Sequence, residues 1–305
     1  MQARGIFLAI IAGASFGLIP LFCIPVVDAG MGYTSIIFYR FLFGCVGMLM
    51  MMWYRQQSLR LTWGDTWRIA ILSAIYVFCA YTLFMSYEYI SSGISTALIY
   101  TNPIWVAIIG ILFLKSRPTM RVIASILITF IGVAMLSGVF GTPISKGGTW
   151  VDTAWGLLLA TLSGVGYGVY LVVLPRLSLK KMPSLKFTFY IFFLSLPMLI
   201  IAAGADCILY GGNIVDTFAL PREAWGAVLV NLILLGLLPT AFSNICVTMA
   251  LRMIDTTIVS VLGAFEPLTA MVIGVAVFHE PFDVFTIIGA LLVLIGVIMI
   301  TRKRT

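Results

Sequence analysis

Ten apolar stretches, each long enough to cross a bilayer as a helix, dominate this chain of 305 residues. A membrane-spanning helix needs about 20 apolar residues, and inside hydrocarbon only helices and closed barrels satisfy every backbone hydrogen bond. With 62% hydrophobic and only 10% charged residues, the composition excludes a water-soluble domain. We therefore predict an all-α integral membrane protein with ten transmembrane helices. The expected spans are 5–27, 34–53, 69–88, 93–114, 121–140, 154–174, 187–205, 225–250, 256–278 and 284–301.

The connections between these spans are short, and the longest, 206–223, has no room for a folded domain. Function is therefore expected inside the bilayer. Residues 1–29 have some features of a signal peptide, but a later segment repeats them, so we interpret them as a span. The five cysteines form no C-x-x-C pair, no Lys/Arg run suits nucleic acid, and no cofactor or metal is expected.

Positive charge predicts the orientation, because Lys and Arg concentrate in cytoplasmic loops. Fifteen of the 18 Lys and Arg residues lie on one side of the predicted membrane and two, Lys146 and Arg222, lie on the other. Both termini are thus expected in the cytoplasm, in a multi-pass cell (inner) membrane protein. The fifteen are Arg4, Arg55, Arg60, Arg68, Lys115, Arg117, Arg121, Arg176, Lys180, Lys181, Lys186, Arg252, Arg302, Lys303 and Arg304.

Comparing the chain with itself indicates an internal repeat. Residues 90–137 align with 254–301 at an offset of 164, and Gly13 and Gly17 align with Gly164 and Gly168 at an offset of 151. Five spans per copy require the second copy to enter the membrane from the opposite side, which is typical of transporters whose substrate site lies between inverted repeats. The expected units are a first repeat over 1–140, an external linker over 141–153 and a second, inverted repeat over 154–305, around a central cavity.

With these repeats, three short motifs resemble the EamA-type family of the drug/metabolite transporter superfamily. They are Glu266-Pro267, His279-Glu280 and the Gly289 to Val297 segment of the last span. The resemblance implies a secondary transporter, often an exporter of amino acids or related metabolites, with the fifth and tenth helices at the periphery. The chain departs from the family pattern at Lys115-Ser116, where the first repeat usually ends its fourth helix with an acid.

Glu266 is the strongest candidate for a functional residue. An ionised carboxylate near mid-bilayer costs several kcal/mol, so it pairs, faces water or takes up a proton. Its repeat partner is Asn102, and prolines follow both residues, at Pro103 and Pro267. Each proline removes an N–H group and frees the carbonyl four residues back, of Ile99 and Gly263. We predict that Asn102, Glu266 and these carbonyls bind substrate or a proton, with Glu266 as the proton-coupling residue; the alternative is a neutral structural acid.

Arg40 is the one cation well inside a span. One interpretation places its side chain in the cavity, holding a substrate carboxylate or pairing with Glu88; the other has it extend to the lipid headgroups. Further candidates for substrate contact are the aromatic and amide side chains of the middle helices; the alternative is packing for the aromatic residues and a local hydrogen bond for the amide. They are Trp105, Tyr81, Tyr167, Tyr170 and Asn244.

An embedded enzyme is excluded as a function class, because one histidine and scattered acids cannot supply a nucleophile with its base or a metal cluster. The expected partners are a small-molecule substrate, the lipid bilayer and protons. The alternatives to amino-acid export are import or exchange of another metabolite class, such as a sugar, a nucleotide-linked compound or a cationic drug-like compound, and a non-transporting membrane scaffold.

Overall fold

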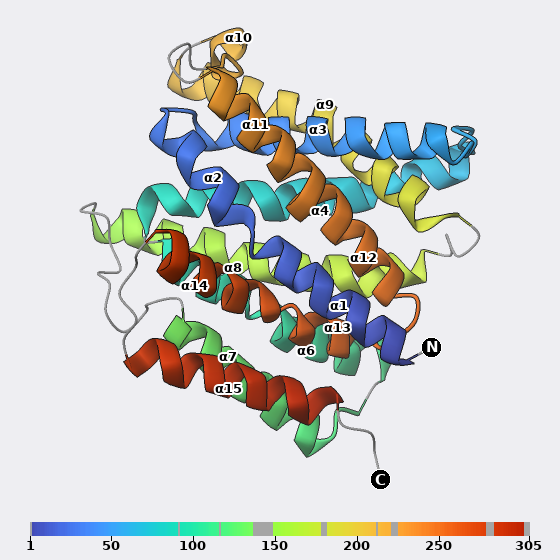
Figure 1. Cartoon of the computed structure of the whole chain (residues 1–305), viewed down its shortest axis with the longest axis vertical. Coiled ribbons are helices and arrows are strands. Elements are labelled where there is room, and N and C mark those ends of the chain that lie inside the picture. Colours follow the sequence, from blue (N-terminus) through green and yellow to red (C-terminus); the bar gives the residue numbers. More distant parts are fainter. Residues whose placement is uncertain are drawn as a thin grey trace.

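The computed structural model shows an all-helical protein, and Figure 1 shows its helices stacked in roughly parallel layers. It describes residues 2–90, 92–115, 117–136, 149–177, 182–211, 213–220, 225–278 and 284–301. Nine helices in these ranges are long and apolar enough to cross a membrane, and α7 is shorter, with 17 residues. The prediction of an all-α integral membrane protein is confirmed.

Several predicted spans consist of two or three helical pieces rather than one. The breaks fall near Pro20, Pro103, Pro239 and Pro267, because proline cannot donate the backbone hydrogen bond of a continuing α-helix. The helices of the N-terminal part of the chain are α1 (Gln2–Phe16), α2 (Ile19–Asp28), α3 (Tyr33–Tyr54), α4 (Trp63–Tyr89), α5 (Ser92–Ile99), α6 (Asn102–Leu114) and α7 (Met120–Leu136).

The C-terminal part contains a similar succession of whole and broken helices. The eighth predicted span has three pieces, of which the middle one, η2, is a π-helix. The elements are α8 (Trp150–Val173), η1 (Leu174–Arg176), α9 (Ser184–Tyr210), α10 (Ile214–Thr217), α11 (Trp225–Leu235), η2 (Gly236–Phe242), α12 (Ser243–Ala250), α13 (Thr256–Leu262), α14 (Phe265–Val277) and α15 (Val284–Thr301).

Helices from the two parts of the chain interleave rather than form separate bodies. Helix α4 packs on α8, α3 on α9 and α1 on α12, while α7 and α15 pack on each other along one edge (Figure 1). In Figure 1 the start of α1 and the end of α15 lie at the same end of the helices. The large buried side chains between these layers include Phe41, Phe187, Phe192 and Tyr170.

Glycines allow the closest helix approaches, and these approaches recur at the offsets found in the sequence. A Cβ atom on Gly13 would lie 3.0 Å from the carbonyl oxygen of Leu262, and one on Gly164 would lie 2.8 Å from that of Leu98. Gly13 lies on α1 and Gly164 on α8. Each of them packs against a span that is broken into two helices, α13 and α14 in the first case and α5 and α6 in the second. Small residues at such crossings permit close backbone contact in membranes.

Gly17 faces α14 most tightly, so we predict that Gly17→Ala destabilises the protein by about 1–3 kcal/mol, the usual cost of overpacking. The added Cβ would lie 2.5 Å from both the carbonyl oxygen of Glu266 and the Cβ of Thr269. Thermal unfolding in detergent measures the effect. The matched control is Gly64→Ala, since a Cβ on this helical glycine has nothing within 4 Å. Equal unfolding temperatures for the two variants would contradict the prediction.

Candidate functional site

Arg40 lies inside the protein and is the only buried charged side chain among the described residues, with 6% of its surface exposed. Its Nε donates a hydrogen bond of 3.1 Å to Oγ1 of Thr240 on η2. Of the two interpretations left open by the sequence, extension to the lipid headgroups is therefore wrong. The pairing with Glu88 is also absent, because Glu88 is exposed and no ion pair within 4 Å joins these two described residues.

The π-helix η2 positions the partner of Arg40. Thr240 donates its hydroxyl proton to the carbonyl oxygen of Leu235 at 2.8 Å, five residues back. Asn244 donates its Nδ2 to the carbonyl oxygen of Thr240 at 2.7 Å and to the hydroxyl of Tyr76 at 3.3 Å. The local hydrogen bond predicted for Asn244 is therefore present, and its contact with substrate stays a prediction.

Glu266 lies in the second position of α14 and is surrounded by protein, yet part of its surface is accessible to solvent. No ion pair within 4 Å forms between it and Arg40. The hydroxyl of Tyr100 lies beside its carboxyl group without a well-formed hydrogen bond, and it is buried and unpartnered. Neither Arg40 nor Glu266 thus forms an ion pair with the other, and Arg40 has a neutral hydrogen-bond partner in Thr240.

The repeat partner of Glu266 makes a different set of contacts. Asn102 is 3% exposed, and its Nδ2 donates to the carbonyl oxygen of Ile99 at 3.0 Å, while its Oδ1 is buried without a partner. The backbone N–H of Glu266 donates to the carbonyl oxygen of Gly263 at 2.9 Å. Each carbonyl thus accepts one hydrogen bond from the residue before the proline and keeps a second lone pair, so its binding of substrate or a proton stays a prediction.

Aromatic rings connect the surroundings of Arg40 with those of Glu266. Tyr76 lies within charge range of both residues, and its ring is 5.3 Å from that of Tyr170, which stacks on Tyr167 at 5.9 Å. Tyr170 is 2% exposed, whereas Tyr167 is only partly buried and interacts with Glu266. Of this predicted pair, Tyr167 is thus the one that keeps part of its surface exposed, whereas Tyr170 lies in the core.

Trp105 lies on α6, after Asn102, and Tyr81 lies on α4, after Tyr76. Both are partly buried. Nε1 of Trp105 donates to Oγ1 of Thr101 at 2.9 Å, and its Cβ packs where Gly168 has no side chain. His279 and Glu280, which form one of the three motifs in the family resemblance, lie outside the described residues, as does Ser116. Three groups of the site were not predicted: Tyr100, Tyr76 and Thr240.

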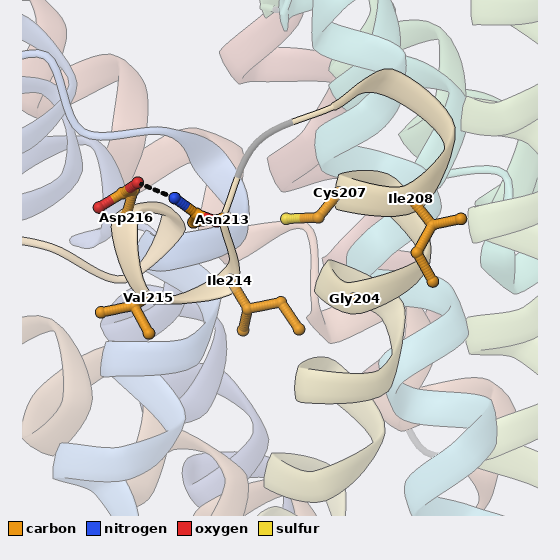
Figure 2. A pocket seen from close by; sticks show the side chains of 7 residues that line it. All are labelled: Gly204, Cys207, Ile208, Asn213, Ile214, Val215 and Asp216. Carbon is orange, nitrogen blue, oxygen red and sulfur yellow. Dashed lines mark hydrogen bonds between the residues drawn. The ribbon is translucent and has the colours of Figure 1, made fainter.

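A cavity of about 490 Å³ lies elsewhere, between the end of α9 and the short helix α10 (Figure 2). In its lining, Nδ2 of Asn213 donates a hydrogen bond of 3.0 Å to Oδ2 of Asp216, drawn as a dashed line in Figure 2. None of the predicted site residues lines it, so it is separate from the region around Arg40 and Glu266. Its lining residues are Gly204, Cys207, Ile208, Asn213, Ile214, Val215 and Asp216.

Comparison with known proteins supplies the family. The model of the EamA-like transporter family matches residues 3–138 and again 154–302. Two proteins of Archaeoglobus fulgidus, each named an uncharacterized transporter, are 25% and 26% identical to the chain; the alignments cover 80% and 88% of this chain and 81% and 88% of theirs. A solved structure titled "Crystal structure of protein" has the same fold, with a TM-score of 0.77 at 16% identity, covering 98% of this chain and 96% of that one.

The unpartnered hydroxyl of Tyr100 generates a stability prediction. Tyr100→Phe is expected to leave the free energy of unfolding unchanged or slightly raised, because no hydrogen bond is lost and a buried polar group is removed. Ser73→Ala is the contrasting variant, since the Ser73 hydroxyl bonds the carbonyl oxygens of Ile69 and Ile191, both at 2.9 Å. It should cost about 1 kcal/mol. Thermal unfolding of both variants in detergent tests this, and a loss with Tyr100→Phe as large as that with Ser73→Ala would refute it.

Proposed function

The chain belongs to the EamA-like transporter family, and we propose that it is a secondary active transporter that exports amino acids or related amphipathic compounds. One observation carries this proposal. Arg40 is buried and Glu266 is only partly exposed, yet no ion pair within 4 Å joins these two charged residues. Unpaired charges inside a membrane protein are costly and mark substrate or ion pathways.

A zwitterion fits this arrangement of charge. The guanidinium group of Arg40 suits a carboxylate, which it can hold with two parallel hydrogen bonds. Glu266 and the tyrosines around it, among them Tyr100, Tyr87 and Tyr167, suit an ammonium group, through charge and through the faces of the rings. A nucleotide sugar or sugar phosphate fits less well, because Arg40 is the one buried cation in the described residues.

The proposed mechanism is alternating access between two inverted repeats, over residues 1–140 and 154–305. The separate family matches to 3–138 and 154–302 support a repeat. The recurring contacts support it further: Gly17 packs against the backbone of Glu266, and Gly168 against that of Asn102, its counterpart at an offset of 164. Swapping the conformations of such halves opens the site first to one side and then to the other.

Glu266 is the proposed site of proton coupling, because its surface is partly accessible while its surroundings are protein. A carboxyl group in this position can take up a proton. Protonation costs less free energy than burying the negative charge while the interior is closed. The proposed location is the cell (inner) membrane with both termini in the cytoplasm, which the distribution of Lys and Arg supports.

The deciding experiment is flux of L-alanine, L-leucine and L-phenylalanine in proteoliposomes, with and without a pH gradient. We expect saturable flux that the gradient accelerates in the wild type. Glu266→Gln should remove the acceleration, with a loss of about tenfold or more, equivalent to about 1.4 kcal/mol. Glu88→Gln is the matched control, since Glu88 is an exposed acid outside the site.

The outcomes separate the alternatives. Equal gradient-driven flux in wild type and Glu266→Gln would make Glu266 a structural acid. Absence of flux for every amino acid would refute the proposed substrate class. Flux of a lipophilic cation under the same conditions would then favour a cationic compound, bound by Glu266 and the tyrosines without Arg40.

Single cysteines test the alternating access. Trp105→Cys and Thr269→Cys lie at positions related by the offset of 164, next to Gly168 and Gly17. Membrane-impermeant thiol reagents should label each of them from one side only, and the accessible side should change when substrate is added. Protection from both sides under all conditions would contradict the mechanism. The wild type is the background control, because four of its five cysteines are buried and Cys207 is partly buried.

A further inference from the structure

We propose that Thr240 is the positioning residue of Arg40 and that, through it, the proline break in the eighth span sets the preference for substrates with a carboxylate. The inference rests on the proposed function, because it gives Arg40 a substrate carboxylate to hold. The π-helix η2 and the buried hydroxyl of Thr240 thereby gain a role in substrate binding.

The role of Thr240 begins with Pro239. In an α-helix the N–H group of residue 239 would donate to the carbonyl oxygen of Leu235, and proline has no N–H group. Here the helix widens to a π-helix over Gly236–Phe242, and the hydroxyl of Thr240 donates to that carbonyl at 2.8 Å. Such π-helical turns occur often at functional sites. The break thus turns the Thr240 side chain back along the helix.

The direction of the hydroxyl proton determines what else Thr240 can do. Because the proton is used on Leu235, the oxygen offers only lone pairs, and it accepts the Nε–H of Arg40 at 3.1 Å. Thr240 is 0% exposed, so in the wild type this oxygen, and not water, is the partner of Nε. As a β-branched residue it also has few rotamers, which keeps the oxygen in place.

The backbone beneath Arg40 is held by the same element. A Cβ atom on Gly236 would lie 2.9 Å from the carbonyl oxygen of Arg40 and 2.8 Å from the backbone nitrogen of Gly44. Helices α3 and η2 are therefore in backbone contact at this point. The carbonyl of Thr240 in turn accepts a hydrogen bond from Asn244 at 2.7 Å. Both the start and the Nε of the Arg40 side chain are thus fixed against η2.

Fixing Nε leaves the other edge of the guanidinium group for a ligand. Nη1 and Nη2 of Arg40 make no hydrogen bond with the described residues, and neither is among the polar atoms sealed from solvent. These two nitrogens match the two oxygens of a carboxylate in a bidentate contact. A guanidinium group without this anchor would rotate freely, and binding a carboxylate would then cost it more conformational entropy.

The test compares Thr240→Val, which keeps the shape and removes the hydroxyl, with Thr240→Ser, which keeps the hydroxyl. In proteoliposomes, Thr240→Val should raise the KM for L-leucine about tenfold, as expected for a lost hydrogen bond to a charged group, with maximal flux unchanged. Inhibition by L-leucinamide, which has no carboxylate, should stay as in the wild type. Thr240→Ser should restore the KM. Equal weakening of acid and amide, or no rescue by serine, would overturn the proposal.

A second measurement needs no substrate. Proton exchange at Nε–H of Arg40 can be followed by NMR in detergent with ¹⁵N-labelled arginine, assigned with Arg40→Lys. The proton should be protected in the wild type and in Thr240→Ser and unprotected in Thr240→Val. Equal protection in all three would overturn the proposal. Protection as expected, together with no amino-acid flux in the wild type, would refute the proposed function and leave the positioning role intact.

Discussion

The structure depends on how backbone carbonyls are paired where a proline lacks the N–H group that would donate to them. Inside hydrocarbon no water compensates an unpaired carbonyl, so each broken span must supply a donor from the protein. Asn102 supplies its amide to Ile99, the backbone N–H of Glu266 serves Gly263, and Thr240 supplies its hydroxyl to Leu235. Each donor belongs to a residue next to a proline. These three breaks are therefore closed locally, and they place polar side chains in the interior without leaving these three carbonyls unpaired.

Close glycine crossings complete this arrangement by holding α1 and α8 against the broken helices. Their backbones approach so closely that a Cβ on Gly17 or Gly168 would meet the residues of the proposed site. Packing and site geometry are thus coupled at these positions. A substitution at Gly17 acts on the backbone of Glu266 directly, whereas the polar groups near Arg40 depend on α3 and η2.

The helical spans and their approximate bounds could be predicted from the sequence, because apolar length alone specifies them. Glu266 and Asn102 were also found from the sequence, since polar residues before proline stand out in apolar helices. The inward position of Arg40 was not, because a long side chain two turns inside a helix can point to the interior or extend to the lipid headgroups, and the neighbouring helix decides between them. Thr240 and Tyr100 were missed, although a hydroxyl residue directly after Pro239 was a usable signal. Tyr100 gave none, since its hydroxyl matters only through its distance from Glu266.

The polar side chains do not follow the backbone repetition, and this has a consequence for resting populations. At the repeat offsets, Ile191 stands where Arg40 would have a counterpart, and Asn102 stands opposite Glu266. In the proposed inverted repeat, the outward-open and inward-open backbones are related by an approximate two-fold axis and have similar energy. The energy difference between them must then come from the side chains that differ between the halves, and Arg40 and Glu266 are two of these without a charged counterpart. In the proposed cycle, these two residues thus bias which side of the membrane the empty protein faces.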